Sequence, residues 1–168
     1  MRVATGGTFD LLHDGHRALL GAAFSLHPHS VLIGLTTDRF ARETRKAVNP
    51  YPTRERNLRK LLRTRRWAPF EIEPIDDVFG PADDRADLDV LVVSAERALV
   101  GKDLNDARQR NGLRPVEVRP VAMVVAEDGL PIQSRRIRAG TIDPHGKRLT
   151  PLGVHVGTDN PGNLRAVR

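Results

Sequence analysis

The sequence predicts an α/β fold in which a doubly wound parallel sheet of about five strands carries helices on both faces. Short apolar runs typical of buried strands alternate along the chain with segments of helical periodicity, which is the pattern of consecutive β-α-β units. The first run leads straight into a glycine-rich turn and a helix. The length of 168 residues fits one domain with at most a small appendage.

Apolar or alternating patterns predict strands at residues 2–4, 31–35, 70–75, 88–93 and 116–126. Helical spacing and capping residues predict helices at 17–26, at 54–66 with Thr53 as the N-cap, at 103–111 and at 132–138. Residues 39–46 are expected to form a polar, basic connection, and residues 49–52 a proline turn. Such a chain winds right-handed crossovers around a parallel sheet, a Rossmann-like arrangement.

Ligands of such sheets bind beyond the carboxyl ends of the strands, where the strand order reverses. Three segments fall at that edge: the turn after the first strand, Ser94 after the strand at 88–93, and the segment 132–138. We therefore expect one site there, built from parts of the chain that lie far apart in sequence.

Composition excludes several classes of protein. Without cysteine there is neither a disulfide framework nor a thiolate metal site, and we expect no dedicated metal ligands. No apolar run approaches the roughly 18 residues of a membrane span, and the N-terminus lacks a signal-peptide pattern, so a cytoplasmic protein is expected. Aromatic residues are few, which argues against a surface that stacks nucleic-acid bases.

The net charge of +6 is unevenly distributed. Residues 39–66 carry eleven arginines and lysines against two glutamates, and residues 71–89 carry eight carboxylates against Arg85. This pattern favours a local funnel for an anion, or a solvated basic helix, over a nucleic-acid surface.

The turn after the first strand has the features of a phosphate site. Gly6 and Gly7 let backbone amides approach a ligand closely, and the start of the next helix adds unpaired N–H groups. His13 and His16, three residues apart, face the same side of the first helical turn, and Gly15 between them leaves the backbone open.

The ordered string GGTFDLLHDGH at residues 6–16 resembles the GTFDxxHxGH signature of the HxGH nucleotidylyltransferase superfamily. The resemblance implies transfer of a nucleotidyl group from a nucleoside triphosphate to a phosphate or hydroxyl, with release of pyrophosphate. Such a transfer depends on positioning and on neutralisation of negative charge.

Residues 131–138, PIQSRRIR, resemble the second signature of these enzymes, an ISSTRIR-type helix start that holds the β- and γ-phosphates. Ser134, Arg136 and Arg138 match it. Gln133 stands where serine is usual. Arg135 stands where threonine is usual, which removes the hydroxyl at that position and adds a positive charge.

Further segments resemble one branch of the superfamily, the phosphopantetheine adenylyltransferases of archaeal and eukaryotic type. They are residues 35–38, 92–96, 111–115, 126–129 and 142–143, so the resemblance covers residues 1 to about 148. The implied reaction joins ATP and 4′-phosphopantetheine to give dephospho-coenzyme A and pyrophosphate. Mg²⁺ is the implied cofactor, bound mainly through the phosphates of ATP.

The resemblance also implies roles for individual residues. Thr8 and His16 act at the transferred phosphate, and Lys46, Arg42 and Arg45 are candidates for the acceptor phosphate. The nucleotide-binding residues implied are Gly6, Gly7, Phe9, His13, Gly15, Ser94, Ser134, Arg136 and Arg138. We expect no nucleic-acid or membrane partner; the oligomeric state stays open, with a monomer favoured.

Two alternatives remain. One is another nucleotidylyltransferase of the superfamily, forming FAD, NAD or a CDP-alcohol, and the other is a non-catalytic nucleotide-binding regulatory module. Residues 1–148 are expected to form the nucleotidylyltransferase domain, and residues 149–168 a tail or an added edge strand. Residues 153–161 faintly resemble the opening of a nucleoside triphosphate pyrophosphatase family, but twenty residues are too few for such a domain.

Overall fold

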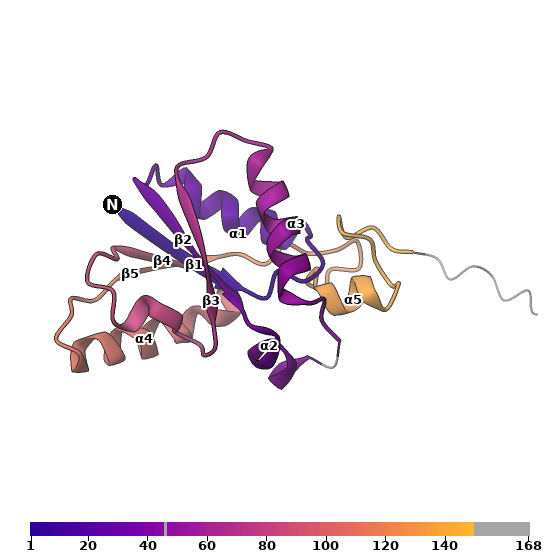
Figure 1. Cartoon of the computed structure of the whole chain (residues 1–168). Helices are drawn as coiled ribbons and strands as arrows, with labels where there is room; N and C mark the ends of the chain where they lie inside the picture. The colour runs from indigo at the N-terminus through magenta and orange to yellow at the C-terminus, as the bar shows by residue number, and fades with distance from the viewer. Residues whose placement is uncertain (46, 150–168) are drawn as a thin grey trace, which may run out of the picture.

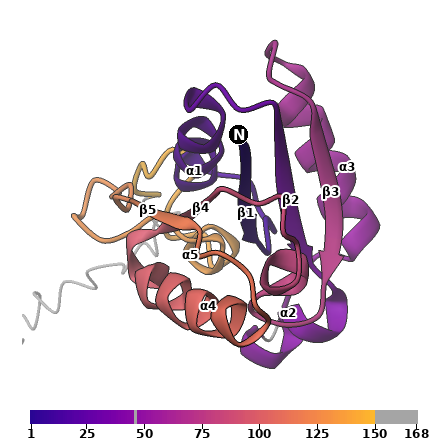
Figure 2. The same ribbon diagram turned by 90° about the vertical axis from the view of Figure 1, so that its left-hand side faces the viewer.

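The structure, a computed structural model, describes residues 1–45 and 47–149. Its centre is a five-stranded sheet in the order β3-β2-β1-β4-β5, in which every neighbouring pair is parallel. Figure 2 shows β1 in the middle, with β2 and β3 on one side and β4 and β5 on the other. The strands are β1 (Arg2–Gly7), β2 (Ser30–Thr36), β3 (Phe70–Ile75), β4 (Val90–Ser94) and β5 (Glu117–Val121).

Helices connect the strands and cover both faces of the sheet, as predicted (Figure 1). The α-helices are α1 (Asp14–Ser25), α2 (Asp38–Thr44), α3 (Tyr51–Arg63), α4 (Ala98–Arg110) and α5 (Ser134–Arg138). Two short 3₁₀ helices, η1 (Gly80–Asp83) and η2 (Ala95–Arg97), precede β4 and α4. The predicted doubly wound α/β fold is therefore confirmed.

The core has two layers because successive strand residues point to opposite faces of a sheet. On one face Val3, Val31 and Ile33 pack with α1 and α3, whose buried residues include Phe24 and Leu58. On the other face lie Ala4, Leu32 and Leu91, which pack with Leu104 of α4 and Ala82 of η1. A smaller cluster of Ala126, Ile132 and Ile142 supports α5.

Several element boundaries differ from the sequence prediction. The expected basic connection at 39–46 contains α2, because the Thr37 hydroxyl accepts a hydrogen bond from Phe40 N and caps a helix there. Helix α3 begins at Tyr51 instead of residue 54, since Pro50 and Pro52 occupy a first turn whose amides need no partner within the helix.

The later elements were also placed inaccurately. Helix α4 begins at Ala98, not at Asp103, because it continues directly from η2. Strand β5 ends at Val121 instead of residue 126, where its pairing with β4 stops. Of the predicted tail, residues 150–168 lie outside the part that the structure describes.

The strand order reverses between β1 and β4. From β1 the chain moves outward through β2 to β3, then returns to place β4 on the opposite side of β1. The carboxyl ends of β1 and β4 therefore form a switch point, the place where doubly wound sheets bind their ligands. Helix α5 lies beyond these ends (Figure 1).

Candidate functional site

A cavity of about 1050 Å³ lies at the switch point. The loop between β1 and α1 lines it, and so does the last residue of β4. Most of the predicted site residues line it, namely Gly6, Gly7, Thr8, Phe9, His13, Gly15, His16, Arg45, Ser94, Ser134 and Arg138. Segments that are far apart in the sequence thus meet in one cavity.

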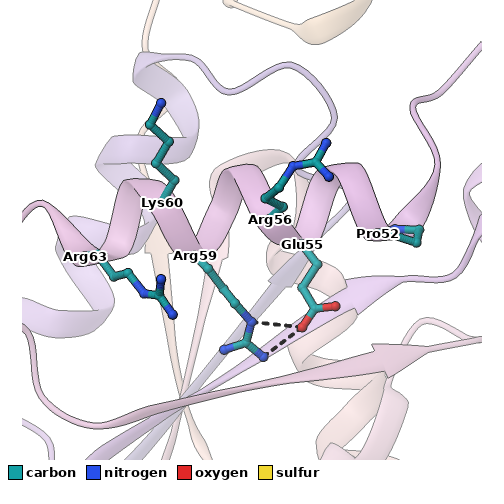
Figure 3. Close-up of a pocket in the computed structure, with 6 residues that line it drawn as sticks. All are labelled: Pro52, Glu55, Arg56, Arg59, Lys60 and Arg63. Atoms are coloured by element: carbon teal, nitrogen blue, oxygen red, sulfur yellow. Dashed lines mark hydrogen bonds and ion pairs between the residues drawn. The ribbon is translucent and has the colours of Figure 1, made fainter.

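A second, smaller hollow of about 420 Å³ lies on α3 (Figure 3). Arg59 donates two hydrogen bonds to Glu55 there, at 2.9 and 2.7 Å, and the other cations point outward from the helix. None of the predicted site residues that the structure describes lines this hollow. It belongs to the basic segment 39–66, for which the charge pattern left open an anion funnel or a solvated helix.

The two histidines of the signature form a stacked pair. Their ring centroids are 3.8 Å apart at an interplanar angle of 24°, and the His16 ring lies 5.1 Å from that of buried Phe9. The Nδ1 atom of each histidine is buried without a hydrogen-bond partner among the described residues. Buried polar atoms without a partner are rare in folded proteins, and a catalytic role is one of the explanations for them.

Burial keeps both histidines neutral. It lowers the pKa of His13 from 6.5 to about 4, with a smaller opposing effect from Asp14 and a further lowering by Arg45. Burial also lowers the pKa of His16 well below 6.5, and His13 and Arg45 lower it further. At neutral pH each ring therefore offers one N–H donor and one acceptor nitrogen instead of a positive charge.

The shifted histidines predict a pH-dependent stability. Below pH 6.5 the unfolded histidines bind protons, but folded His13 does so only near pH 4. The free energy of unfolding should therefore fall as the pH drops from 6.5 towards 4, by about 1.4 kcal/mol per pH unit for each fully shifted histidine. Urea unfolding of the wild type and of His13→Gln between pH 7.5 and 4.5 measures this. The variant should show the shallower dependence, and equal slopes would contradict the assignment.

Helix α5 is fastened to the signature loop by two contacts. The Ser134 hydroxyl donates to Leu11 O at 3.1 Å and accepts from Leu11 N at 3.3 Å. Arg138 donates to buried Asp10 at 2.8 Å, and the second carboxylate oxygen of Asp10 accepts from Asn49 N at 2.8 Å. The two signature segments therefore form one unit at the cavity wall.

Two of the predicted residues that the structure describes do not line the cavity, and a third lies outside the described part of the chain. Arg136 turns away, bonding Asp128 and the carbonyls of Leu130 and Pro131. Arg42 of α2 is exposed and outside the lining. Lys46 lies outside the described residues. Of the two described cations proposed for the acceptor phosphate, Arg45 lines the cavity and Arg42 does not.

Arg45 belongs to a group of cations at the cavity. Burial lowers the pKa of its guanidinium, and the charges of Arg97 and Arg135 lower it further, while Asp10 and Glu96 act in the opposite direction. Arg97, from η2, was not predicted from the sequence; Arg135 is the residue that replaces the usual threonine. Three arginines that repel one another are typical of a surface shaped for an anion.

The cavity also has an apolar part that the sequence did not predict. Leu32, Ile75, Phe79, Leu91 and Leu104 line it beside the face of the sheet that carries α4. Phe79 lies in a tight turn. In this turn Asp77 Oδ1 accepts hydrogen bonds from the amides of Phe79 and Gly80, at 2.9 and 2.6 Å. Gly80 has a φ of 53°, and a Cβ there would lie 2.3 Å from Ile75.

No set of three or more histidine, cysteine, aspartate or glutamate side chains within residues 1–45 and 47–149 is placed to hold a metal ion. Across the same residues, no helix has the length and apolar character needed to cross a membrane.

The doubly wound sheet, the HxGH loop and the cavity at the switch point define a nucleotidyltransferase-type domain. The family model described as cytidylyltransferase-like matches residues 4–140, and the chain belongs to that family. A crystal structure of a protein with unknown function from Archaeoglobus fulgidus has the same fold, with a TM-score of 0.65 and 36% sequence identity over 72% of this chain and 89% of that one.

Curated relatives identify the branch. The phosphopantetheine adenylyltransferase of Methanothermobacter thermautotrophicus is 40% identical over 144 residues, which cover 86% of this chain and 87% of that protein. The bifunctional phosphopantetheine adenylyltransferase/NTP phosphatase of Thermoplasma volcanium is 39% identical over 167 residues, 99% of this chain and 50% of that protein. Within the family, the chain belongs with the phosphopantetheine adenylyltransferases. It spans about half the length of the bifunctional relatives that it matches.

Proposed function

We propose that this chain transfers the adenylyl group of ATP to 4′-phosphopantetheine, giving dephospho-coenzyme A and pyrophosphate. The observation that carries the proposal is the continuity of one cavity from the HxGH loop to an apolar part under the sheet. A phosphate ester with a long, weakly polar arm matches such a cavity, because its charge meets the loop and its arm meets the apolar wall. Archaeal relatives named for this reaction support it.

The reaction requires an in-line displacement. A phosphate oxygen of the acceptor attacks the α-phosphorus of ATP, one P–O bond forms, the bond to the bridging oxygen breaks, and pyrophosphate leaves. Neutral His16 donates its N–H to the transferred phosphate together with the Thr8 hydroxyl, and both stabilise charge that increases in the transition state. His13, stacked on His16, holds that ring in place.

The remaining residues divide between the two substrates. Gly6, Gly7, Phe9 and Gly15 shape the phosphate-binding loop, Ser94 lies on the adenine side, and Ser134 and Arg138 fix α5 at the β- and γ-phosphates. The cavity carboxylates are Asp10, already bonded twice, and Glu96. Two carboxylates are too few for a dedicated Mg²⁺ site, so the ion would be held mainly by the triphosphate and by water, and it would add neutralising charge.

Arg45 is proposed to hold the acceptor phosphate. Arg45→Ala should raise the KM for phosphopantetheine about 10- to 100-fold, which corresponds to the loss of hydrogen bonds to a charged group, and should change the KM for ATP much less. Arg42→Ala is the matched control, since Arg42 does not line the cavity. Steady-state kinetics with each substrate varied separately decide the assignment. A selective effect on the KM for ATP would move Arg45 to the nucleotide.

The decisive experiment measures pyrophosphate release from ATP and Mg²⁺ with four acceptors: 4′-phosphopantetheine, nicotinamide mononucleotide, FMN and glycerol 3-phosphate, the last also with CTP. We expect release with phosphopantetheine alone. Release with another acceptor would keep the chemistry and assign the chain to a different nucleotidylyltransferase reaction. No release with any acceptor, despite measurable ATP binding, would favour a regulatory module.

A further inference from the structure

Among the arginines that the structure describes, two are fully buried: Arg54 in α3 and Arg108 in α4. Arg108 donates to the carbonyls of Ala82, Arg85 and Arg114, and so fastens α4 to the segment around η1. Arg54 contacts the site instead. Its Nε donates to Asn49 O at 2.8 Å, and its two terminal nitrogens donate to Thr8 O at 2.9 Å, Thr36 Oγ1 at 3.3 Å and Asp38 Oδ1 at 2.8 Å.

We propose that Arg54 is a positioning residue that fixes the Thr8–Phe9 peptide, so that the Phe9 amide donates to a phosphate oxygen of the nucleotide. In a trans peptide the C=O and N–H bonds point in opposite directions. Arg54 holds the Thr8 carbonyl on the core side of the loop. The Phe9 N–H therefore points the other way, on a segment that lines the cavity.

The conformation of Phe9 requires such support. Its φ of 46° is in the left-handed region, which residues other than glycine adopt only when their surroundings hold them there. The ring is fully buried against His16, which fixes the side chain. The hydrogen bond from Arg54 to Thr8 O fixes the peptide that precedes Phe9 and contains its nitrogen. Together the two contacts hold a donor beside the histidine pair.

An arginine is needed at this position because its planar fork reaches several acceptors at once. The four acceptors belong to the β1–α1 loop, the end of β2, the start of α2 and the turn before α3. Asp38 balances the buried charge at 2.8 Å. The ammonium of lysine can reach only part of this set, so Arg54→Lys keeps the charge but releases the loop.

The first test measures kcat of the adenylyl transfer and therefore rests on the proposed function. Arg54→Lys should lower kcat about 100-fold, a loss that a misplacement of about 1 Å in a site can cause. Arg108→Lys is the matched control, because it removes an equally buried guanidinium that also bonds backbone carbonyls. It should destabilise the protein to a similar extent but keep kcat within about threefold of the wild type. Equal kcat losses in the two variants would overturn the proposal.

A second test does not need the reaction. The chain has five phenylalanines, so selective ¹⁵N-phenylalanine labelling gives a simple amide spectrum. On addition of ATP, the Phe9 resonance should shift in the wild type and in Arg108→Lys but not in Arg54→Lys. A Phe9 shift in Arg54→Lys equal to that of the wild type would overturn the proposal. If no acceptor supports turnover, the proposed function fails, while this spectrum still decides the role of Arg54.

If Arg54→Lys does not fold, Asp38→Asn replaces it in both tests. The asparagine keeps the oxygen that accepts from Tyr51 N but removes the charge that orients the guanidinium. It should lower kcat about tenfold and reduce the Phe9 shift. Wild-type values for both quantities would overturn the proposal.

Discussion

His16→Ala should lower kcat by a factor of about 10²–10³, which is the cost of removing one preorganised donor to a transition state. The ATP affinity should change little, because the interaction strengthens only as charge builds on the transferred phosphate. The fold should also remain, since the His16 ring stacks on His13 and lies tilted against Phe9, and its buried Nδ1 makes no hydrogen bond among the described residues.

Stopped-flow or coupled pyrophosphate release measures kcat, and titration calorimetry measures ATP binding. His29→Ala is the control, because His29 is an exposed histidine that contacts the N-terminal amine and lies outside the cavity. Turnover of His16→Ala at the wild-type rate would refute the mechanism. If ATP affinity fell by the same factor, His16 would instead contribute to binding ATP in the ground state.

Gly15→Ala should reduce kcat about 10- to 100-fold without unfolding the protein. A Cβ at position 15 would lie 2.9 Å from Cε1 and 3.0 Å from Nδ1 of His13, so the imidazole must move. Because His13 stacks on His16 at 3.8 Å, the displacement passes to the ring beside the reacting phosphate. The helix itself favours alanine over glycine by up to about 1 kcal/mol, which offsets the steric cost.

The same helix supplies the control for this prediction. A Cβ at Gly21 would meet nothing within 4 Å, so Gly21→Ala adds the helix preference without a clash. It should stabilise the protein by about 0.5–1 kcal/mol and leave turnover unchanged. Thermal unfolding and kcat of both variants test the argument. If Gly15→Ala had full activity, the requirement for glycine in the signature would not be steric.

The fold and the signature loop were predictable because their information is local. Apolar runs marked β2 and β3 closely, and the spacing of His13 and His16 placed both rings on one side of α1, where they stack. The boundaries of α2 and α4 were harder to predict. Helix α2 begins where the Thr37 hydroxyl caps it, and helix α4 begins early because it continues from η2.

Arg54 escaped prediction because it stands among eleven cations that together suggest a solvated face. A signal was nevertheless present. Arg54, Leu58 and Leu62 are four residues apart in turn, so the arginine lies on the buried stripe of α3. Arg108 follows Leu104 by four residues in the same way in α4. The apolar wall around Phe79 had no comparable signal, because a charge-rich segment concealed the turn that presents it.

The fastening of α5 to the signature loop has a consequence for how the protein is made. The contacts Ser134–Leu11 and Arg138–Asp10 join residues 123 and 128 positions apart. The loop that carries His13 and His16 leaves the ribosome before most of the sheet, but helix α5, which fastens it, is synthesised only after all five strands. A nascent chain can thus pair the strands of its sheet before it can complete its site. Such distant pairings form slowly because a long loop must close first. The proposed nucleotide site is therefore completed only after the sheet that carries it.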